Sequence, residues 1–233
     1  MDERIARDPA AIRAMFAEVA PRYDVLNRML SLRQDVRWRR LLVAALGHAP
    51  AGRILDLATG TGDVALAIPD RAVTGADFCL DMLTIARRKR GRPVRRVTWA
   101  AADALALPFP ARCFAGVVIA FGVRNFADLA AGFGEISRVL VAGGILGVLE
   151  LHRPERRAVA VVSRLWNRLV VTPVGRLVSH DGSAYAYLPA SVDTFPGRAR
   201  LAELLRAQGY GVLASRDLSG GIAALTVARW EGR

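Results

Sequence analysis

Three aspartates stand at the ends of three short apolar segments, and a glycine turn follows the first of them. Asp56 lies in the segment RILDL, Asp77 ends VTGAD, and Asp103 follows a third apolar segment. The first segment continues as Thr59-Gly60-Thr61-Gly62 and then as the helix-like DVALAI. A buried strand, a glycine turn and a helix start form the nucleotide-binding corner of a doubly wound sheet. Carboxylates at such strand ends accept hydrogen bonds from ribose hydroxyls or meet a cationic amino group.

The glycine turn by itself leaves the kind of ligand open. Gly60-x-Gly62-x-x-Ala65 also fits the loose dinucleotide fingerprint. No phosphate-binding lysine accompanies the turn, whereas three acids do. These acids suit a ligand that carries a sulfonium, an amino acid and a ribose, so we expect S-adenosylmethionine. Asp56 would meet its amino group, Asp77 its ribose and Asp103 its adenine end.

Each acid also has a purely structural interpretation. Asp56 could cap a helix, Asp77 could form an Asx-turn, and Asp103 could be an ordinary loop residue. Taken singly, any one of the three acids fits its structural interpretation. Three acids at the ends of successive strands favour a ligand site.

Composition favours a single domain over residues 1–233, because 233 residues with 53% hydrophobic content can bury one substantial core. Within it, we expect a helical cap at 1–50, a cofactor-binding core at 51–152, and substrate-side helices with closing strands at 153–233. The longest apolar run, Val139 to Leu151, contains Glu150 and is too short for a membrane span. The N-terminus has no signal-peptide core, so we expect a cytoplasmic protein.

The cysteines and histidines do not indicate a metal site. Cys79 and Cys113 are the only cysteines and belong to no CxxC pair, and the three histidines are scattered along the chain. We therefore expect no metal and no disulfide framework.

The net charge of +12 raises the question of a polyanionic partner. Lys89 is the only lysine among the 33 lysine and arginine residues, which indicates a compositional bias of the whole chain. The densest cluster, residues 87–96, is interpreted as a solvated face. A basic surface would also favour anionic lipid, so we expect transient contact with a membrane surface at the inner face of the cell membrane. We expect no nucleic-acid partner, and a homo-oligomer stays open.

The apolar pattern alternates in the βαβ manner from residue 53 onward. We expect strands at 53–57, 73–77, 95–101, 115–121 and 144–151, and helices at 63–68, 80–90 and 127–141. A closing antiparallel pair would follow at 209–218 and 221–230. The amphipathic stripe from Val161 to Val170 predicts a helix that faces the core, a lipid tail or a bilayer.

Six ordered segments resemble the menaquinone and ubiquinone biosynthesis C-methyltransferase family. The first fits the pattern YDxxNxxLSxxxxxxW from Tyr23 to Trp38. The others are DLATGTGD, the stretch from Asp103 to LPFP, FGVRNFAD, RVLVAGGILGVLEL and SAYAYLPASVDTFP. The resemblance covers nearly the whole chain and is far more specific than a glycine turn.

The resemblance implies an α/β fold of the Class I S-adenosylmethionine-dependent methyltransferases, a Rossmann-like seven-stranded sheet with an N-terminal helical cap. It implies C-methylation of a prenylated hydroquinone, with demethylmenaquinol favoured because Asp35 stands where benzoquinol-active members carry histidine. The alternatives are a 2-polyprenyl-6-methoxy-1,4-benzoquinol of ubiquinone biosynthesis and another small acceptor. At the matching positions, the implied cofactor-binding residues are Asp56, Gly60, Thr61, Gly62, Asp77, Phe78, Asp103, Ala104 and Ala120.

Arg124 and Asn125, at the end of the fourth predicted strand, are the first candidates for contacting the substrate oxygen, and Tyr23 of the cap is the second. Family analogy also favours them as the catalytic residues. Arginine is a poor proton acceptor, so Arg124 is interpreted as a stabiliser of the phenolate. Tyr185 and Tyr187 could line the quinone pocket, although an alternating aromatic pair more often serves packing.

The departures and rival activities are few. His152 stands where the family often has serine, Val141 replaces a usual lysine, and the stretch between Gly62 and Asp77 is short. A short-chain dehydrogenase would need Tyr-x-x-x-Lys, but Ile85 precedes Lys89 by four residues. A nucleic-acid methyltransferase would need Asn-Pro or Pro-Cys, and neither pair occurs. A catalytically silent cofactor-binding protein stays open.

Overall fold

One seven-stranded sheet organises the computed structural model, which describes residues 9–89, 97–171, 173 and 183–232. Its order is β3-β2-β1-β4-β5-β7-β6. The first five strands run parallel, and β7 is antiparallel to both of its neighbours. The direction of winding reverses between β1 and β4, where such folds bind ligands. The strands are β1 (Ile54–Leu57), β2 (Val73–Asp77), β3 (Val97–Ala101), β4 (Phe114–Ala120), β5 (Leu140–Leu151), β6 (Tyr210–Leu218) and β7 (Ala223–Trp230).

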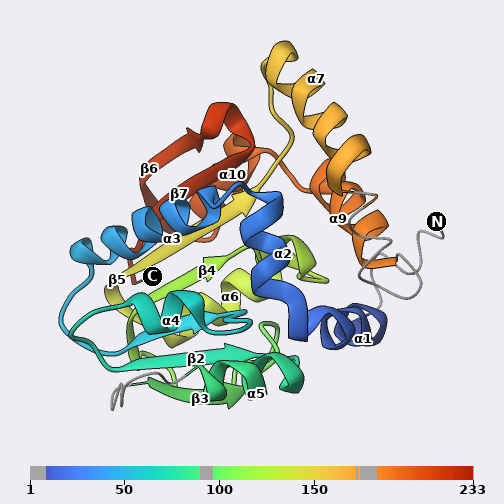
Figure 1. Ribbon diagram of the computed structural model, residues 1–233. Coiled ribbons are helices and arrows are strands. Elements are labelled where there is room, and N and C mark those ends of the chain that lie inside the picture. The colour runs from blue at the N-terminus through green and yellow to red at the C-terminus, as the bar shows by residue number, and fades with distance from the viewer. Residues whose placement is uncertain (1–8, 90–96, 172, 174–182, 233) are drawn as a thin grey trace.

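The helices fall into three groups by their place in the chain. Three precede the sheet, namely α1 (Pro9–Val19), α2 (Tyr23–Leu30) and α3 (Gln34–Ala45). Three connect strands, namely α4 (Asp63–Ala67), α5 (Leu80–Arg88) and α6 (Leu129–Val139). In the part of the chain that the structure describes, the segments between β5 and β6 are α7 (Arg157–Trp166), the π-helical η5 (Asn167–Val171), α9 (Ser183–Thr194) and α10 (Arg198–Ala207). Figure 1 shows α1, α2, α7 and α9 at the end of the sheet toward which β2 and β5 point.

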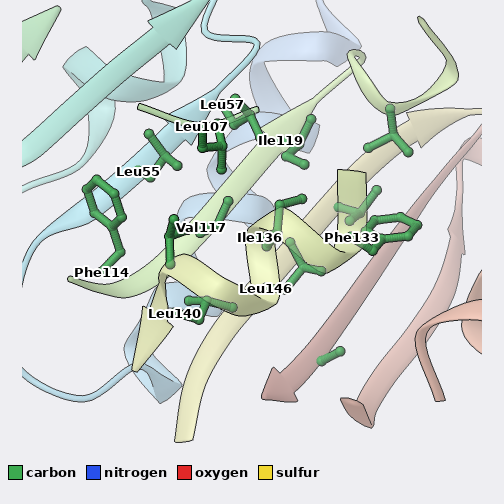
Figure 2. Packing of buried hydrophobic residues seen from close by; sticks show 14 of the residues in the cluster. Leu55, Leu57, Leu107, Phe114, Val117, Ile119, Phe133, Ile136, Leu140 and Leu146 are labelled. Carbon is green, nitrogen blue, oxygen red and sulfur yellow. The ribbon is translucent and has the colours of Figure 1, made fainter. Parts of the chain in front are cut away.

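Hydrophobic residues cover both faces of the sheet. On one face, Phe133 and Ile136 of α6 join Leu55 and Leu146 in one buried cluster, part of which Figure 2 shows. On the other face, Leu42 of α3 packs with residues that alternate with these along the same strands. Strands buried on both faces read as continuous apolar runs, which is why they were predictable.

The predicted parallel strands, the N-terminal helices and the closing antiparallel pair are confirmed, with corrections to their bounds. The helix predicted for 127–141 ends at Val139, and β5 begins at Leu140 rather than at residue 144. Leu140 pairs with Phe114 before a register shift, and Gly143 adopts a φ of 77° there. The segment of α9 was not predicted as a helix, since Pro189 lies inside it. Residues 90, 95 and 96 of the predicted elements lie outside the described residues.

The stripe on α7 is less buried than a core-facing helix would be. None of the residues in α7 is buried, and Val161, Val162 and Leu165 are each more than half exposed. Among the described residues, no helix is both long enough and apolar enough to cross a membrane.

Gly62 illustrates how packing fixes the glycine turn. Its φ is 83°, and a Cβ there would lie 2.5 Å from Cη2 of Trp99 and 3.1 Å from Cβ of Ala86. Gly62 therefore makes room for the indole of Trp99 in β3, in addition to forming the turn.

We expect Gly62→Ala to lower the free energy of unfolding by about 1–3 kcal/mol, because the added methyl overpacks against Trp99 and the positive φ disfavours alanine. Gly134→Ala is the control, since nothing lies within 4 Å of its Cβ position in α6, and it should be neutral or stabilising. Urea unfolding followed by circular dichroism measures both. Equal effects at the two positions would contradict this account of the turn.

Candidate active site

Two cavities open at the carboxyl ends of the parallel strands. The first, called the polar cavity because charged and amide side chains form part of its wall, measures about 730 Å³ and lies beside the ends of β2, β3 and β4. Its wall includes six of the predicted site residues, namely Asp77, Phe78, Asp103, Ala104, Arg124 and Asn125. The second, the apolar cavity, measures about 390 Å³ and is enclosed by residues of the N-terminal helices, α7, η5 and α9. Leu26, Trp38, Trp166 and Leu188 are among its lining residues.

Arg124 is part of the wall of both cavities. Its side chain is only 6% exposed and forms an ion pair with Glu150, with 2.7 Å between Nη1 and Oε1. Nη1 also donates to the carbonyl of Phe121 at 2.7 Å. Burial alone would lower the pKa of Arg124, but Glu150, Tyr23 and Tyr187 together hold it above its ordinary value. Arg124 is therefore a fixed cation between the two cavities.

The Nε atom of Arg124 is buried and has no hydrogen-bond partner within the described part of the chain. A buried donor without a partner is costly, so native proteins rarely keep one without a reason. Here the donor belongs to a side chain that borders two cavities.

Glu150 was not predicted as a site residue. It is 2% exposed, and besides Arg124 it accepts hydrogen bonds from the backbone amides of Arg124 at 3.2 Å and Leu151 at 2.9 Å. The sequence held a signal, because an acid inside a thirteen-residue apolar run must find a partner. Removing one partner of such a pair typically costs about 3–5 kcal/mol.

Two residues next to the site have a strained backbone. Phe121 has a φ of 62° and Ala58 one of 53°, values that are rare for residues with side chains. They follow β4 and β1, the two strands at the switch point. Strain of this kind is typical of functional sites, where the surrounding structure holds a side chain or carbonyl in a required direction.

Asn125 and Tyr187 form a second polar link between the cavities. The Tyr187 hydroxyl donates to Oδ1 of Asn125 at 2.9 Å. Tyr187 lines the apolar cavity, as predicted, while Asn125 lines the polar one. Burial raises the pKa of Tyr187 against the opposing effect of Arg124. The side chain of Tyr185 lies outside the described residues.

Tyr23 lies beside the glycine turn. It lines the apolar cavity, and its Cε1 atom is 4.0 Å from the Cβ position of Gly60. Phe16 packs edge-on against both Tyr23 and Phe78, with ring centroids 6.3 and 6.5 Å apart. These rings form part of the boundary between the cavities.

Asp77 and Asp103 keep some hydrogen-bonding capacity toward the polar cavity. Asp77 accepts from the amides of Gly60 at 2.7 Å and Cys79 at 2.9 Å, and burial raises its pKa. Asp103 is exposed and accepts from the amide of Leu105 at 2.9 Å. Each carboxylate oxygen has two lone pairs, so both side chains can still accept hydroxyl or amino donors.

The remaining predicted cofactor residues do not line either cavity. These residues are Asp56, Gly60, Thr61, Gly62 and Ala120. Asp56 is 1% exposed and accepts from the Thr59 hydroxyl at 2.5 Å and the Ala65 amide at 2.9 Å, so it braces the glycine turn from inside. Their direct contact with a cofactor stays a prediction. His152 is also absent from both linings, and its Nδ1 lies 3.1 Å from the carbonyl of Arg153.

Comparison with solved structures gives the class of protein. An S-adenosylmethionine-dependent methyltransferase from Thermotoga maritima superposes with a TM-score of 0.64 at 18% identity, covering 93% of this chain and 98% of that one. Together with the strand order and the site at the switch point, this likeness defines a Class I S-adenosylmethionine-dependent methyltransferase fold, which confirms the predicted fold class.

Sequence comparison gives the family. The ubiE/COQ5 methyltransferase family matches residues 4–229, and the chain belongs to that family. A demethylmenaquinone methyltransferase of Thermus thermophilus is 50% identical over 218 residues, which is 91% of this chain and 98% of the relative. A ubiquinone/menaquinone biosynthesis C-methyltransferase of Syntrophotalea carbinolica is 43% identical over 217 residues, 91% of each chain. The predicted family and the prediction of a methyltransferase are thereby confirmed.

The raised pKa of Asp56 predicts how the stability of the protein depends on pH. Burial raises the pKa of Asp56 from 3.8 to about 7, so its ionisation opposes folding. The contribution of Asp56 to stability is complete below about pH 4 and is lost as the pH rises through about 7. We expect the free energy of unfolding of the wild type, relative to Asp56→Asn, to fall by roughly 2–3 kcal/mol between pH 5 and pH 8. Urea titrations at both pH values measure it, and parallel pH profiles would contradict it.

Proposed function

We propose that this protein transfers the methyl group of S-adenosylmethionine to a ring carbon of a prenylated hydroquinone, with demethylmenaquinol as its substrate. The observation that carries the proposal is that Arg124 borders both cavities. A methyl donor in the polar cavity and a hydroquinone in the apolar cavity would meet beside this one cation. The apolar lining suits a flat ring with a hydrocarbon tail.

The choice of a naphthoquinol is supported by the relatives. The Thermus protein, at 50% identity, is named for demethylmenaquinone alone, whereas the Syntrophotalea protein is named for both quinones. Asp35, the residue that favoured a naphthoquinol, is 3% exposed and lines the apolar cavity. A benzoquinol of ubiquinone biosynthesis is therefore the second candidate.

The polar cavity fits the methyl donor. Its volume of about 730 Å³ lies within the range of small-molecule sites. Asp77 and Asp103 offer acceptors for ribose and adenine donors, and Phe78 and Phe126 offer apolar surface. Within the described residues, Cε1 of Tyr23 at 4.0 Å is the one atom that comes within 4 Å of the Cβ position of Gly60. When bound, the donor supplies an already activated methyl on a sulfonium.

The chain's own task is to align the reacting atoms and to exclude water. A ring carbon becomes nucleophilic when the neighbouring hydroxyl loses its proton. Arg124 is charged and held by Glu150, so it would stabilise the resulting phenolate without reorganising. Its raised pKa makes it a poor proton acceptor, and the proton would leave through water.

Asn125 and Tyr23 would orient the ring. With Oδ1 of Asn125 taken by Tyr187, the amide nitrogen is the group that can donate to a ligand oxygen. Tyr23 approaches from the cap and places a hydroxyl near the same wall. Arg124, which borders both cavities, would act on the substrate oxygen from between Tyr23 on the apolar side and Asn125 on the polar side.

The direct test incubates the protein with methyl-labelled S-adenosylmethionine and either reduced demethylmenaquinone or a demethylated benzoquinol, followed by lipid extraction. Label in the naphthoquinol supports the proposal, and label in both quinols makes the enzyme dual-function. No label in either, with donor binding intact by calorimetry, would overturn the proposed substrate class.

Arg124→Met should lower kcat by about 10²–10³-fold, because it removes the donor that stabilises the phenolate. Arg124→Lys keeps the charge but not the planar fork, so it should recover only part of that loss. Circular dichroism and donor calorimetry establish that each variant is folded. Arg206→Met, at an exposed position of α10, is the control for charge loss. Wild-type kcat in folded Arg124→Lys and Arg124→Met variants would remove Arg124 from the mechanism.

We also propose that α7 and η5 dock on an anionic bilayer, from which the prenylated substrate would enter the apolar cavity. Leu165 and Leu169 are 55% and 62% exposed, one helical turn apart, and Arg164 and Arg168 are exposed beside them. Trp166 is unsuited to insertion, because its indole donates to the Leu30 carbonyl at 3.1 Å and lines the cavity.

Leu165→Glu and Leu169→Glu should each weaken binding to phosphatidylglycerol vesicles by roughly tenfold or more, since burying a leucine contributes about 1.5–3 kcal/mol. Turnover of a short-tailed, water-soluble quinol should be unchanged. Leu213→Glu, at a 46% exposed position on β6, is the matched control. Vesicle co-sedimentation measures binding, and unchanged binding by folded variants would reject this surface.

A further inference from the structure

A single ammonium group connects the cap to the glycine turn. Nζ of Lys89, which follows α5, lies 2.7 Å from Oγ1 of Thr61 and 2.7 Å from Oδ1 of Asp63, and it also contacts Oδ2 of Asp24. Asp24 belongs to α2, Thr61 to the glycine turn, and Asp63 to the start of α4. Two parts of the chain that are far apart in the sequence, α2 and the glycine turn with the start of α4, therefore converge on one side chain.

Further polar contacts close the same junction. The Thr61 hydroxyl donates to Oδ1 of Asp24 at 2.5 Å. From α3, Arg39 donates to Oδ2 of Asp63 at 3.2 Å and to Oδ2 of Asp35 at 2.5 Å. Both α2 and α3 are thus attached to the glycine turn and the start of α4.

The residue type at position 89 matches this geometry. An ammonium is compact and has three N–H donors, one for each of the three acceptors around it, whereas a guanidinium is a planar fork. All other basic residues of this chain except the histidines are arginine. The one lysine stands at the junction where a planar group would fit poorly.

The junction lies next to the proposed reaction centre without touching it. Asp24 follows Tyr23, whose ring lies beside Gly60, and Thr61 follows Gly60. Lys89 itself lines neither cavity. A shift of Lys89 would move the cap and the turn relative to one another.

We propose that Lys89 is a positioning residue, which holds the cap against the glycine turn and thereby sets both the affinity for the methyl donor and the place of Tyr23 over it. This proposal rests on the proposed methyl transfer for its effect on turnover, but its effect on donor affinity stands without it. The side chains of Lys89, Asp24 and Asp63 are 20–22% exposed. Removing one partner of ion pairs that are this much buried leaves a charge without compensation, so a loss of global stability accompanies the local effect and is measured beside it.

The first experiment compares Lys89→Met, Lys89→Arg and Asp24→Asn, with Arg88→Met as a control that removes one exposed charge from the same helix. Lys89→Met should raise the dissociation constant of the methyl donor about tenfold and lower kcat about tenfold. Lys89→Arg should recover only part of both. Arg88→Met should leave both unchanged, and urea unfolding establishes that all four variants are folded under the conditions of the assay.

Asp24→Asn distinguishes a positioning role from direct contact with the donor. It should reproduce part of the defect of Lys89→Met, and the double variant should be no worse than Lys89→Met alone, because the contact that Asp24→Asn weakens is one of those that Lys89→Met removes. A folded Lys89→Met with wild-type affinity and kcat would overturn the proposal. So would tighter donor binding in Asp24→Asn, which would indicate that the freed ammonium contacts the donor itself.

A second readout uses the fact that Lys89 is the only lysine. Acetic anhydride labels its amine, and mass spectrometry follows the rate without a substitution. Bound S-adenosylhomocysteine should slow this labelling severalfold, because it keeps the junction closed. Equal rates with and without S-adenosylhomocysteine would overturn the coupling. Since this measurement needs no quinol, it fails or succeeds independently of the proposed substrate.

Discussion

The ion pair between Arg124 and Glu150 is the interaction on which the site depends. Both groups are almost entirely removed from water. Glu150 also accepts hydrogen bonds from the backbone amides of Arg124, which follows β4, and of Leu151, which ends β5. A buried pair of this kind is rarely more stabilising than well-packed hydrophobic residues of the same volume. Its value therefore lies in the site, where it keeps a cation at a defined position and fixes the direction of the strained turn after β4.

Around that cation the fold separates two chemically different spaces. The strand ends and their acids form the polar cavity, while the N-terminal helices with α7, η5 and α9 enclose the apolar one. Phe16, Tyr23 and Phe78 stand along the boundary. A charged methyl donor and an apolar methyl acceptor dissolve in different environments. Under the proposed function, this arrangement would give each of them a suitable environment within reach of the other.

The sheet was predictable because its strands are buried on both faces and its turns carry glycine, so local pattern and tertiary position agree. Asp77 and Asp103 line the polar cavity because they stand at the ends of β2 and β3, and their contact with a ligand stays a prediction. What the sequence did not reveal depends on contacts between distant segments. Tyr187 meets Asn125 across 62 residues, Trp99 fills the space over Gly62, and Lys89 was interpreted as part of a solvated cluster although three acceptors surround it. Asp56 was predicted to meet the amino group of the ligand; it is 1% exposed and accepts hydrogen bonds from Thr59 and Ala65, and its contact with the ligand stays a prediction.

The lack of any buried residue in α7 has a consequence for how such a protein can change over time. Both hydrophobic clusters of the sheet are complete without this helix. Substitutions on its outer side therefore leave the folding of the sheet and the geometry of the donor site largely untouched. The choice of acceptor and of the surface from which it comes can drift separately from the methyl-transfer chemistry, which makes this helix the natural place for new specificities to arise.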